Sequence, residues 1–146
     1  MNGQVDVILP CLDEAQALPG VLAALPPGYR ALVVDNGSTG GTPEIAAALG
    51  ATVQQEPRRG YGAAVHAGLV AASAEVVAVL DADGSLDPGA SPAMVALLAQ
   101  PRISIPRDAR LVQPPIPLDH VGNVVLGCPS GVGRSDCSEG VGELVT

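Results

Sequence analysis

The sequence predicts an α/β fold in which a doubly wound, mostly parallel sheet carries helices on both faces. Short apolar runs alternate with helical patterns in the order β-α-β-α-β-α-β-α. Such alternation with short connections is typical of a parallel sheet. The 146 residues are enough for one domain, whose core Ala, Val, Leu and Ile must fill because the sequence has no Phe or Trp.

The first strand and the first helix are predicted between residue 5 and residue 25. Residues 5–9 form a short apolar run, which predicts a strand that Pro10 ends. Asp13 and Glu14 are expected in the first turn of a helix, where carboxylates complement the helix dipole. The apolar residues that follow lie on one helical face and extend this helix to about Leu25.

The second strand and helix are separated by a loop that is rich in turn-forming residues. Residues 31–34 are apolar and predict the strand, and residues 35–42 form the loop. Thr42 is expected to cap the next helix, with Pro43 at its first position. Gly50 is expected to close that helix.

Two further units complete the regular part of the chain. Residues 51–54 predict a short third strand, and residues 63–72 predict a helix of small residues. Residues 76–80 are continuously apolar, which is typical of a strand that is buried on both faces. A last helix is predicted from residue 87 to residue 98.

Asp81 and Asp83 stand at the end of the buried fourth strand. Two carboxylates so close together raise each other's pKa unless a cation joins them. Carboxylate oxygens suit hard divalent ions such as Mg²⁺ and Mn²⁺, and open α/β folds bind ligands at the carboxyl edge of the sheet. The pair therefore indicates a metal site, with a solvated acidic turn as the alternative.

Polar and glycine-rich segments follow other strands of the predicted sheet. They are residues 10–14, residues 35–38 and the loop of residues 58–62. Carboxylates at strand ends accept hydrogen bonds from a base or a ribose, and glycines let a backbone approach a ligand closely. Arg58 and Arg59 near a helix N-terminus suit phosphate, although a solvated pair of loop residues is equally consistent. Together these segments predict a pocket for a nucleotide diphosphate compound.

In their order and spacing, these segments resemble the nucleotide-binding half of a family 2 glycosyltransferase with the GT-A fold. Within that family the similarity is to the dolichyl- or polyprenyl-phosphate sugar transferases. The matching segments are residues 7–14, 33–42, 59–68 and 80–84.

The resemblance implies which residues form the site. It implies a nucleotide-sugar site made of Pro10, Glu14, Asp35, Gly60, Gly62 and Asp81. It also implies that Asp81 and Asp83 form the Asp-x-Asp motif of the family and hold Mg²⁺ or Mn²⁺, with Asp83 as the direct ligand. No residue is identified as a catalytic base.

The activity implied by the resemblance is transfer of a sugar from a nucleotide-diphosphate sugar by inverting, metal-assisted displacement. The implied acceptor is a polyprenyl phosphate. The sequence begins without a basic, apolar leader and has no apolar run of membrane-spanning length, so the expected location is the cytoplasm. The acceptor implied by the resemblance would place the chain at the inner face of the membrane.

The sequence departs from the family pattern in two places. The family usually carries acidic residues where this chain has Asn36 and Gly40. The second departure is in residues 101–146, where Pro and Gly become frequent and the acceptor-binding half of the family is not recognised. Residues 1–100 are for this reason expected to form a truncated GT-A-like domain. The segment of residues 101–146 is expected to be irregular, either disordered or a frameshifted or truncated remnant, and residues 121–126 are its one candidate strand. Nucleotide-sugar binding is expected to survive, with weak or absent transfer.

Three other functions were weighed against sugar transfer. A haloacid-dehalogenase-type phosphatase shares an Asp-x-Asp segment but needs a Lys, and this chain has none. A dinucleotide fingerprint lacks its third glycine, since position 65 is Val. A nucleotide-sugar-binding module without catalysis remains an alternative. Nucleic acid is not an expected partner, because the net charge is −8 and the basic residues do not cluster.

Overall fold

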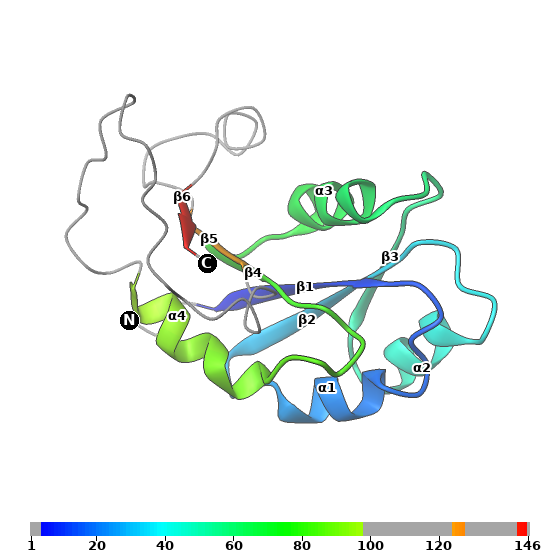
Figure 1. Cartoon of the computed structure of the whole chain (residues 1–146), viewed down its shortest axis with the longest axis horizontal. Coiled ribbons are helices and arrows are strands. Elements are labelled where there is room, and N and C mark those ends of the chain that lie inside the picture. The colour runs from blue at the N-terminus through cyan, green and yellow to red at the C-terminus, as the bar shows by residue number, and fades with distance from the viewer. Residues whose placement is uncertain (1–3, 98–123, 128–142, 146) are drawn as a thin grey trace.

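The computed structural model describes residues 4–97, 124–127 and 143–145, and the fold is given for these residues. They form a six-stranded sheet with the order β3-β2-β1-β4-β5-β6 (Figure 1). The first four strands are parallel neighbours, and β5 and β6 are added antiparallel. The strands are β1 (Val5–Cys11), β2 (Tyr29–Asp35), β3 (Thr52–Gln55), β4 (Val76–Val79), β5 (Val124–Gly127) and β6 (Glu143–Val145).

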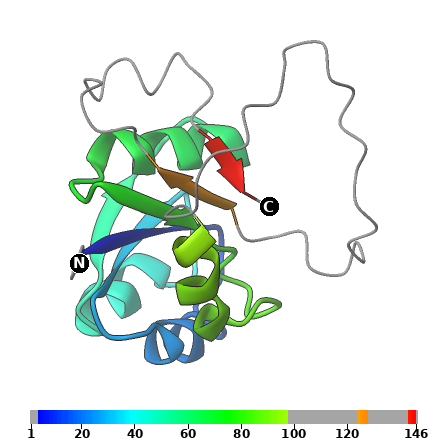
Figure 2. The same ribbon diagram turned by 90° about the vertical axis from the view of Figure 1, so that its left-hand side faces the viewer.

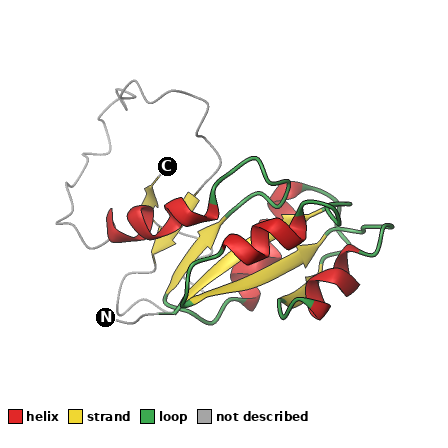
Figure 3. Cartoon of the chain, turned by 90° about the horizontal axis from the view of Figure 1, so that it is seen from below, coloured by secondary structure: helices red, strands yellow, loops and turns green. Residues whose placement is uncertain are grey.

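Helices cover both faces of the sheet, as the sequence predicts. Figures 1 and 2 show α3 on one face and α1, α2 and α4 on the other. Figure 3, seen from below, shows helices of the second group in front of the twisted strands. The helices are α1 (Leu18–Ala24), α2 (Thr42–Ala48), α3 (Tyr61–Ala71), the 3-10 turn η1 (Pro88–Ala90) and α4 (Ser91–Leu97). None of the helices in the described residues has the length and apolar character needed to cross a bilayer.

The central strand β1 is buried on both faces because successive side chains point to opposite sides of the sheet. Val7 and Leu9 lie in the core beneath α1, α2 and α4, whereas Ile8 lies in the core beneath α3. Helix α3 approaches β1 closely at Gly68, where an added Cβ would lie 2.5 Å from a methyl carbon of Ile8. Apart from Asp6, residues 5–9 of the strand are apolar, as this double burial requires.

The amino edge of the sheet is fastened by Asp6, whose side chain is fully buried in β1. Arg30 of β2 donates to both carboxylate oxygens, at 2.8 and 2.7 Å. The backbone N–H groups of Ser73 and Ala74, before β4, donate to Asp6 Oδ2. Although burial favours the neutral acid, the bonds from Arg30, Ala74 and Ser73 hold the pKa of Asp6 below its usual value. One carboxylate thus joins three neighbouring segments.

Helix α1 begins later than the sequence predicts. It starts at Leu18 and has no acidic residue in its first turn. Asp13 instead adopts a left-handed conformation with φ 57°, and its carboxylate accepts hydrogen bonds from Thr39. The placement of Asp13 and Glu14 in a helical turn is therefore wrong, because a contact with a distant loop holds this segment out of the helix.

The expected cap of α2 is also wrong. The residue at the N-cap is Gly41, with φ 79°, and Thr42 lies inside the helix. The hydroxyl of Thr42 is buried and has no hydrogen-bond partner within the described part of the chain. Gly50, with φ 86°, closes the helix as predicted, and its N–H donates to Ala47.

The C-terminal strands bear on the expectation for residues 101–146. The strand predicted at residues 121–126 corresponds to β5, which begins at Val124. The pattern gave no indication of β6 at Glu143–Val145. The rest of the expected irregular segment lies outside the described residues.

Candidate functional site

The carboxyl edge of the sheet gathers the polar segments named from the sequence. In the register of the parallel strands, Cys11 lies opposite Asp35, and Ile8 lies opposite Val79. The residues that follow β1, β2 and β4 therefore emerge at the same edge. The strand order also reverses between β1 and β4, since β2 lies on one side of β1 and β4 on the other. Open α/β sheets bind ligands at such a reversal.

The loops after β1 and β2 are joined by hydrogen bonds in both directions. The N–H of Asn36 donates to the carbonyl of Cys11 at 2.9 Å. The N–H of Asp13 donates to Ser38 Oγ at 2.9 Å, and the N–H of Thr39 donates to Asp13 Oδ1 at 2.8 Å. Pro10 and Glu14, both half-buried, therefore lie in a segment that is tied to the loop after Asp35.

Asp35 is the last residue of β2 and is only 4% exposed. Its carboxylate accepts hydrogen bonds from the N–H groups of Gly37 and Ser38, at 3.4 and 3.2 Å. These two bonds fold the loop back over the strand end, as expected for an Asp that starts a turn. The carboxylate keeps further acceptor positions, because each oxygen offers two lone pairs.

Asn36 connects the end of β2 to the loop before α3. Its side-chain amide donates to the carbonyls of Glu56 and Arg58, at 2.8 and 2.7 Å. Its Oδ1 accepts a hydrogen bond from the N–H of Gly60 at 2.9 Å. Asn36 is 7% exposed, so this amide uses all three bonds away from solvent. Sequence reasoning noted only the missing charge at this position and not the clamp that an uncharged amide makes.

The two arginines of the loop have different surroundings. The guanidinium of Arg58 forms an ion pair with the buried Glu56 at 2.9 Å. Hydrogen bonds from the Arg58 side chain and backbone lower the pKa of Glu56 to about 2. Arg59 forms no ion pair with another described residue, and its Nη2 would lie 3.9 Å from a Cβ added at Gly37. Arg59, beside the loop after Asp35, is thus the one of the two whose charge is available to a phosphate.

The carboxylates of Asp81 and Asp83 differ in their environment. Asp81 is half-buried, and its Oδ1 accepts a hydrogen bond from the hydroxyl of Tyr61 at 3.0 Å. Asp83 is exposed, and its Oδ1 accepts a hydrogen bond from the N–H of Ser85 at 2.8 Å. The hydrogen bonds from Ser85 hold the pKa of Asp83 below its usual value. The expectation that proximity raises the pKa is therefore wrong for Asp83, because these donors stabilise its charged form.

The donor set of this pair fits a hard divalent ion with incomplete protein coordination. Within residues 4–97, 124–127 and 143–145, no group of three or more His, Cys, Asp or Glu side chains is placed to hold a metal. Mg²⁺ is usually bound by one or two carboxylates together with water and substrate phosphates. Asp81 and Asp83 provide carboxylate oxygens of this kind, so a diphosphate would complete the coordination.

The glycines of the loop leave space beside the start of α3. Gly60 has φ 125° and precedes the helix, and Gly62 is its second residue. A Cβ added at either position would meet no atom within 4 Å.

Tyr61, between Gly60 and Gly62, was not singled out from the sequence as a site residue. Desolvation of its hydroxyl, followed by its bond to Asp81, raises the pKa of Tyr61 to about 12, so that the hydroxyl donates at neutral pH. Tyr61 is 57% exposed. Even the ordinary pKa of a tyrosine keeps the hydroxyl protonated at neutral pH, so it can donate this hydrogen bond.

Cys11 and His66 carry potentially reactive side chains that differ in their burial. Cys11 is 2% exposed, and burial, followed by the charges of Glu14 and Asp35, raises the pKa of its thiol to about 12. Cys11 is thus a small buried residue, and a thiol that stays protonated is a poor nucleophile. His66 is exposed on α3.

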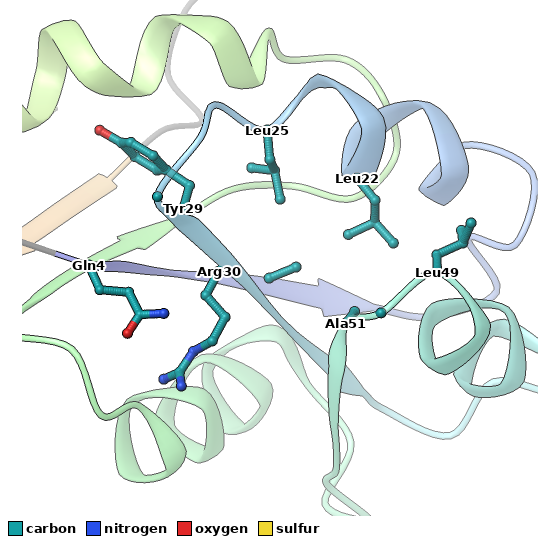
Figure 4. Close-up of a pocket in the computed structure, with 10 residues that line it drawn as sticks. Gln4, Leu22, Leu25, Tyr29, Arg30, Leu49 and Ala51 are labelled. Carbon is teal, nitrogen blue, oxygen red and sulfur yellow. The ribbon is translucent and has the colours of Figure 1, made fainter.

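A hollow of about 380 Å³ lies at the opposite edge of the sheet (Figure 4). It is bordered by the amino ends of β2 and β3, by α1 and by the end of α2, and includes Leu22, Tyr29 and Arg30. Arg30 is already paired with Asp6. None of the described residues that line the hollow is Asp or Glu. The hollow lies at the opposite ends of the strands from the candidate site and is separate from it.

Comparison with known proteins agrees with this geometry. The model of the family described as Glycosyl transferase family 2 matches residues 6–112. An uncharacterized glycosyltransferase of Mycobacterium tuberculosis is 62% identical over 94 residues, which are 64% of this chain and 43% of that protein. A dolichyl-phosphate hexose transferase of Haloferax volcanii is 38% identical over 80 residues, covering 53% of this chain and 35% of that protein. The chain therefore spans less than half of the length of these relatives.

A solved structure shows the same architecture. The glucosyl-3-phosphoglycerate synthase of Mycobacterium tuberculosis, in complex with Mn²⁺, uridine diphosphate and glucosyl-3-phosphoglycerate, aligns with a TM-score of 0.58 and 28% identity. The alignment covers 66% of this chain and 39% of that one. The prediction of a GT-A-like α/β fold is thereby confirmed, and the phosphatase and dinucleotide-binding alternatives are not favoured.

Proposed function

The chain belongs to glycosyl transferase family 2, and from this premise we propose that its carboxyl edge binds a nucleotide-diphosphate sugar and a divalent ion for sugar transfer. The observation that carries the proposal is the hydrogen-bonded assembly of four strand ends at one edge. Asn36 joins the second strand end to the loop after the third, and Tyr61 joins that loop to Asp81 after the fourth. Acidic groups, glycines and the guanidinium of Arg59, which forms no ion pair with another described residue, thus lie on connected segments at this edge.

Each part of the nucleotide sugar has residues of suitable chemistry. Pro10, Glu14 and Asp35 are proposed to border the base and the ribose. A carboxylate accepts hydrogen bonds well from the hydroxyls of a ribose. The backbone around Gly60 and Gly62, at the N-terminus of the 11-residue α3, is proposed to lie along the diphosphate. A helix N-terminus and open space favour a phosphate at this place.

Asp81 and Asp83 are proposed to hold Mg²⁺ or Mn²⁺ against the diphosphate. When bound, the ion supplies positive charge where the departing diphosphate develops negative charge. Asp81 and Asp83 would orient the diphosphate by holding the positive charge of the ion in place. Arg59 adds a second positive charge from the neighbouring loop. The displacement is proposed to invert the configuration at the anomeric carbon. The Mn²⁺ and uridine diphosphate in the related synthase support this assignment.

The acceptor is proposed to be a polyprenyl phosphate at the cytoplasmic membrane face. The similarity to a dolichyl-phosphate hexose transferase supports this choice. A phosphate oxygen is already ionised at neutral pH, so it attacks without a general base from the protein. Such an acceptor therefore suits a site in which no catalytic base has been identified. Holding the acceptor in line with the anomeric carbon provides much of the rate.

The proposal is tested by measuring sugar transfer and binding on the same preparation of the chain. Radiolabelled nucleotide sugars are offered with Mn²⁺ and either a polyprenyl phosphate or 3-phosphoglycerate. We expect nucleotide-sugar binding with at most weak transfer, and any transferred label should appear in the lipid fraction alone. Transfer to 3-phosphoglycerate alone would contradict the lipid acceptor, and binding without any transfer would identify a binding module. Absence of nucleotide-sugar binding would contradict the proposed function as a whole.

A further inference from the structure

We propose that Tyr61 is a positioning residue of the metal site, which fixes the Asp81 carboxylate in the orientation that metal–diphosphate binding requires. This inference rests on the proposed function and deepens it. The hydroxyl of Tyr61 donates to Asp81 Oδ1 at 3.0 Å, although the two residues are 20 positions apart. The bond joins the start of α3 to the end of β4.

The position of Tyr61 is itself determined by neighbouring contacts. Tyr61 is the first residue of α3, and Gly60 before it donates its N–H to Asn36 Oδ1. Asn36 is buried at the end of β2. A continuous series of contacts therefore runs from β2 through Asn36, Gly60 and Tyr61 to Asp81. The hydroxyl is presented from the first residue of a helix whose preceding loop is held by Asn36, so that it favours one orientation of the carboxylate.

The two carboxylates depend on different donors for their orientation. Asp83 is held by Ser85, which lies two residues further along the same turn. Asp81 is held by a side chain from another element. A single hydroxyl donor leaves the second oxygen of Asp81 and a lone pair on the first available to other partners. Metal-binding carboxylates are commonly oriented by such hydrogen bonds, which strengthen metal binding without contacting the ion.

The exposure of the pair is consistent with this role. Tyr61 is 57% exposed and Asp81 is half-buried, so a ligand reaches the carboxylate beside the ring. A core tyrosine would instead contribute mainly by packing. Removing only the hydroxyl of Tyr61 should therefore leave the fold intact and free the Asp81 carboxylate to rotate.

The test uses Tyr61→Phe in the full chain and calorimetric titration with uridine diphosphate and guanosine diphosphate. In Mn²⁺ we expect affinity for the nucleotide that binds to fall roughly tenfold, the usual effect of losing a hydrogen bond to a metal ligand. In chelator we expect no change. Tyr29→Phe is the matched control, because Tyr29 lies at the amino end of β2 and should leave both affinities unchanged.

A second variant keeps the result independent of any general effect on folding. In the background of Asp81→Ala, Tyr61→Phe should cause no further loss, because the acceptor of its hydrogen bond is gone. Unchanged affinity of Tyr61→Phe in Mn²⁺ would overturn the inference, as would an equal loss with and without the metal. If the unmodified chain binds neither nucleotide, the proposed function fails and this inference fails with it. If it binds and only the Tyr61 effect is absent, the proposed function stands alone.

Discussion

Asn36 illustrates how one uncharged side chain organises the site. Its NH₂ group donates to two carbonyls, and its Oδ1 accepts from one N–H, all within the loop of residues 56–60. A carboxylate at this position could accept from Gly60 but could not donate to the two carbonyls. The family resemblance noted from the sequence implies an acidic residue at this position, and the asparagine present instead makes contacts that a carboxylate could not make.

Asn36→Asp should therefore destabilise the chain despite its family-like charge. The carboxylate would face two carbonyl oxygens in a site that is 7% exposed. We expect the free energy of unfolding at neutral pH to fall by roughly 2–4 kcal/mol, because buried groups lose their partners and a charge is desolvated. Urea denaturation measures this, with Gln16→Glu as an exposed amide-to-acid control. A loss no larger than that of the control would contradict the clamp.

At the residue scale, the sequence indicated the groups that stand at strand ends. Asp35, Asp81 and Asp83 each follow an apolar run, so their shared edge could be inferred from the parallel sheet. Asn36 and Tyr61 were not recognised because their partners are 20 or more positions away. Local patterns do not contain such contacts.

At the scale of elements, the packing of α3 on β1 places the helix start over the site. Gly68 makes this close approach possible, because its missing side chain leaves room for Ile8. The contact lies two helical turns from Tyr61, so it also sets the distance of the helix from the sheet.

Gly68→Ala should destabilise the chain although alanine favours helices. The added methyl would lie 2.5 Å from Ile8 Cγ2, and we expect a loss of about 1–3 kcal/mol from overpacking. Gly20→Ala is the matched control, because Gly20 lies in α1 with no atom within 4 Å of the added Cβ. That control should gain up to about 1 kcal/mol. Thermal unfolding compares the two, and equal stability of both variants would contradict the close approach.

The sequence predicted the order of the elements better than their ends. Alternation of apolar runs and helical patterns was sufficient for the parallel sheet and for the placement of helices on both faces. The start of α1 was misplaced because Asp13 bonds to Thr39, and the cap of α2 was misplaced because Gly41 adopts the left-handed conformation. Both errors arise where a turn, rather than a periodic pattern, decides the boundary.

At the scale of the whole molecule, the two edges of the sheet differ in charge and in use. At the amino edge Asp6 is neutralised by Arg30 and by backbone donors. At the carboxyl edge Asp81 accepts from Tyr61 and Asp83 accepts from Ser85, and neither has a cationic partner within the described residues. The first edge holds strands together, and the second keeps two carboxylates without a cationic partner among the described residues, which the proposed metal and diphosphate site would use.

The central claim is that Asp81 and Asp83 bind a divalent ion together with a nucleotide diphosphate. Calorimetric titration of the chain with uridine and guanosine diphosphate, in Mn²⁺ and in chelator, tests it most directly. We expect the affinity for the nucleotide that binds to be at least about tenfold higher in Mn²⁺ than in chelator. Asp83→Ala should abolish this difference. Glu75→Ala, which removes an exposed acid before the same strand, should preserve it. Equal affinity of the unmodified chain in Mn²⁺ and in chelator would contradict the account.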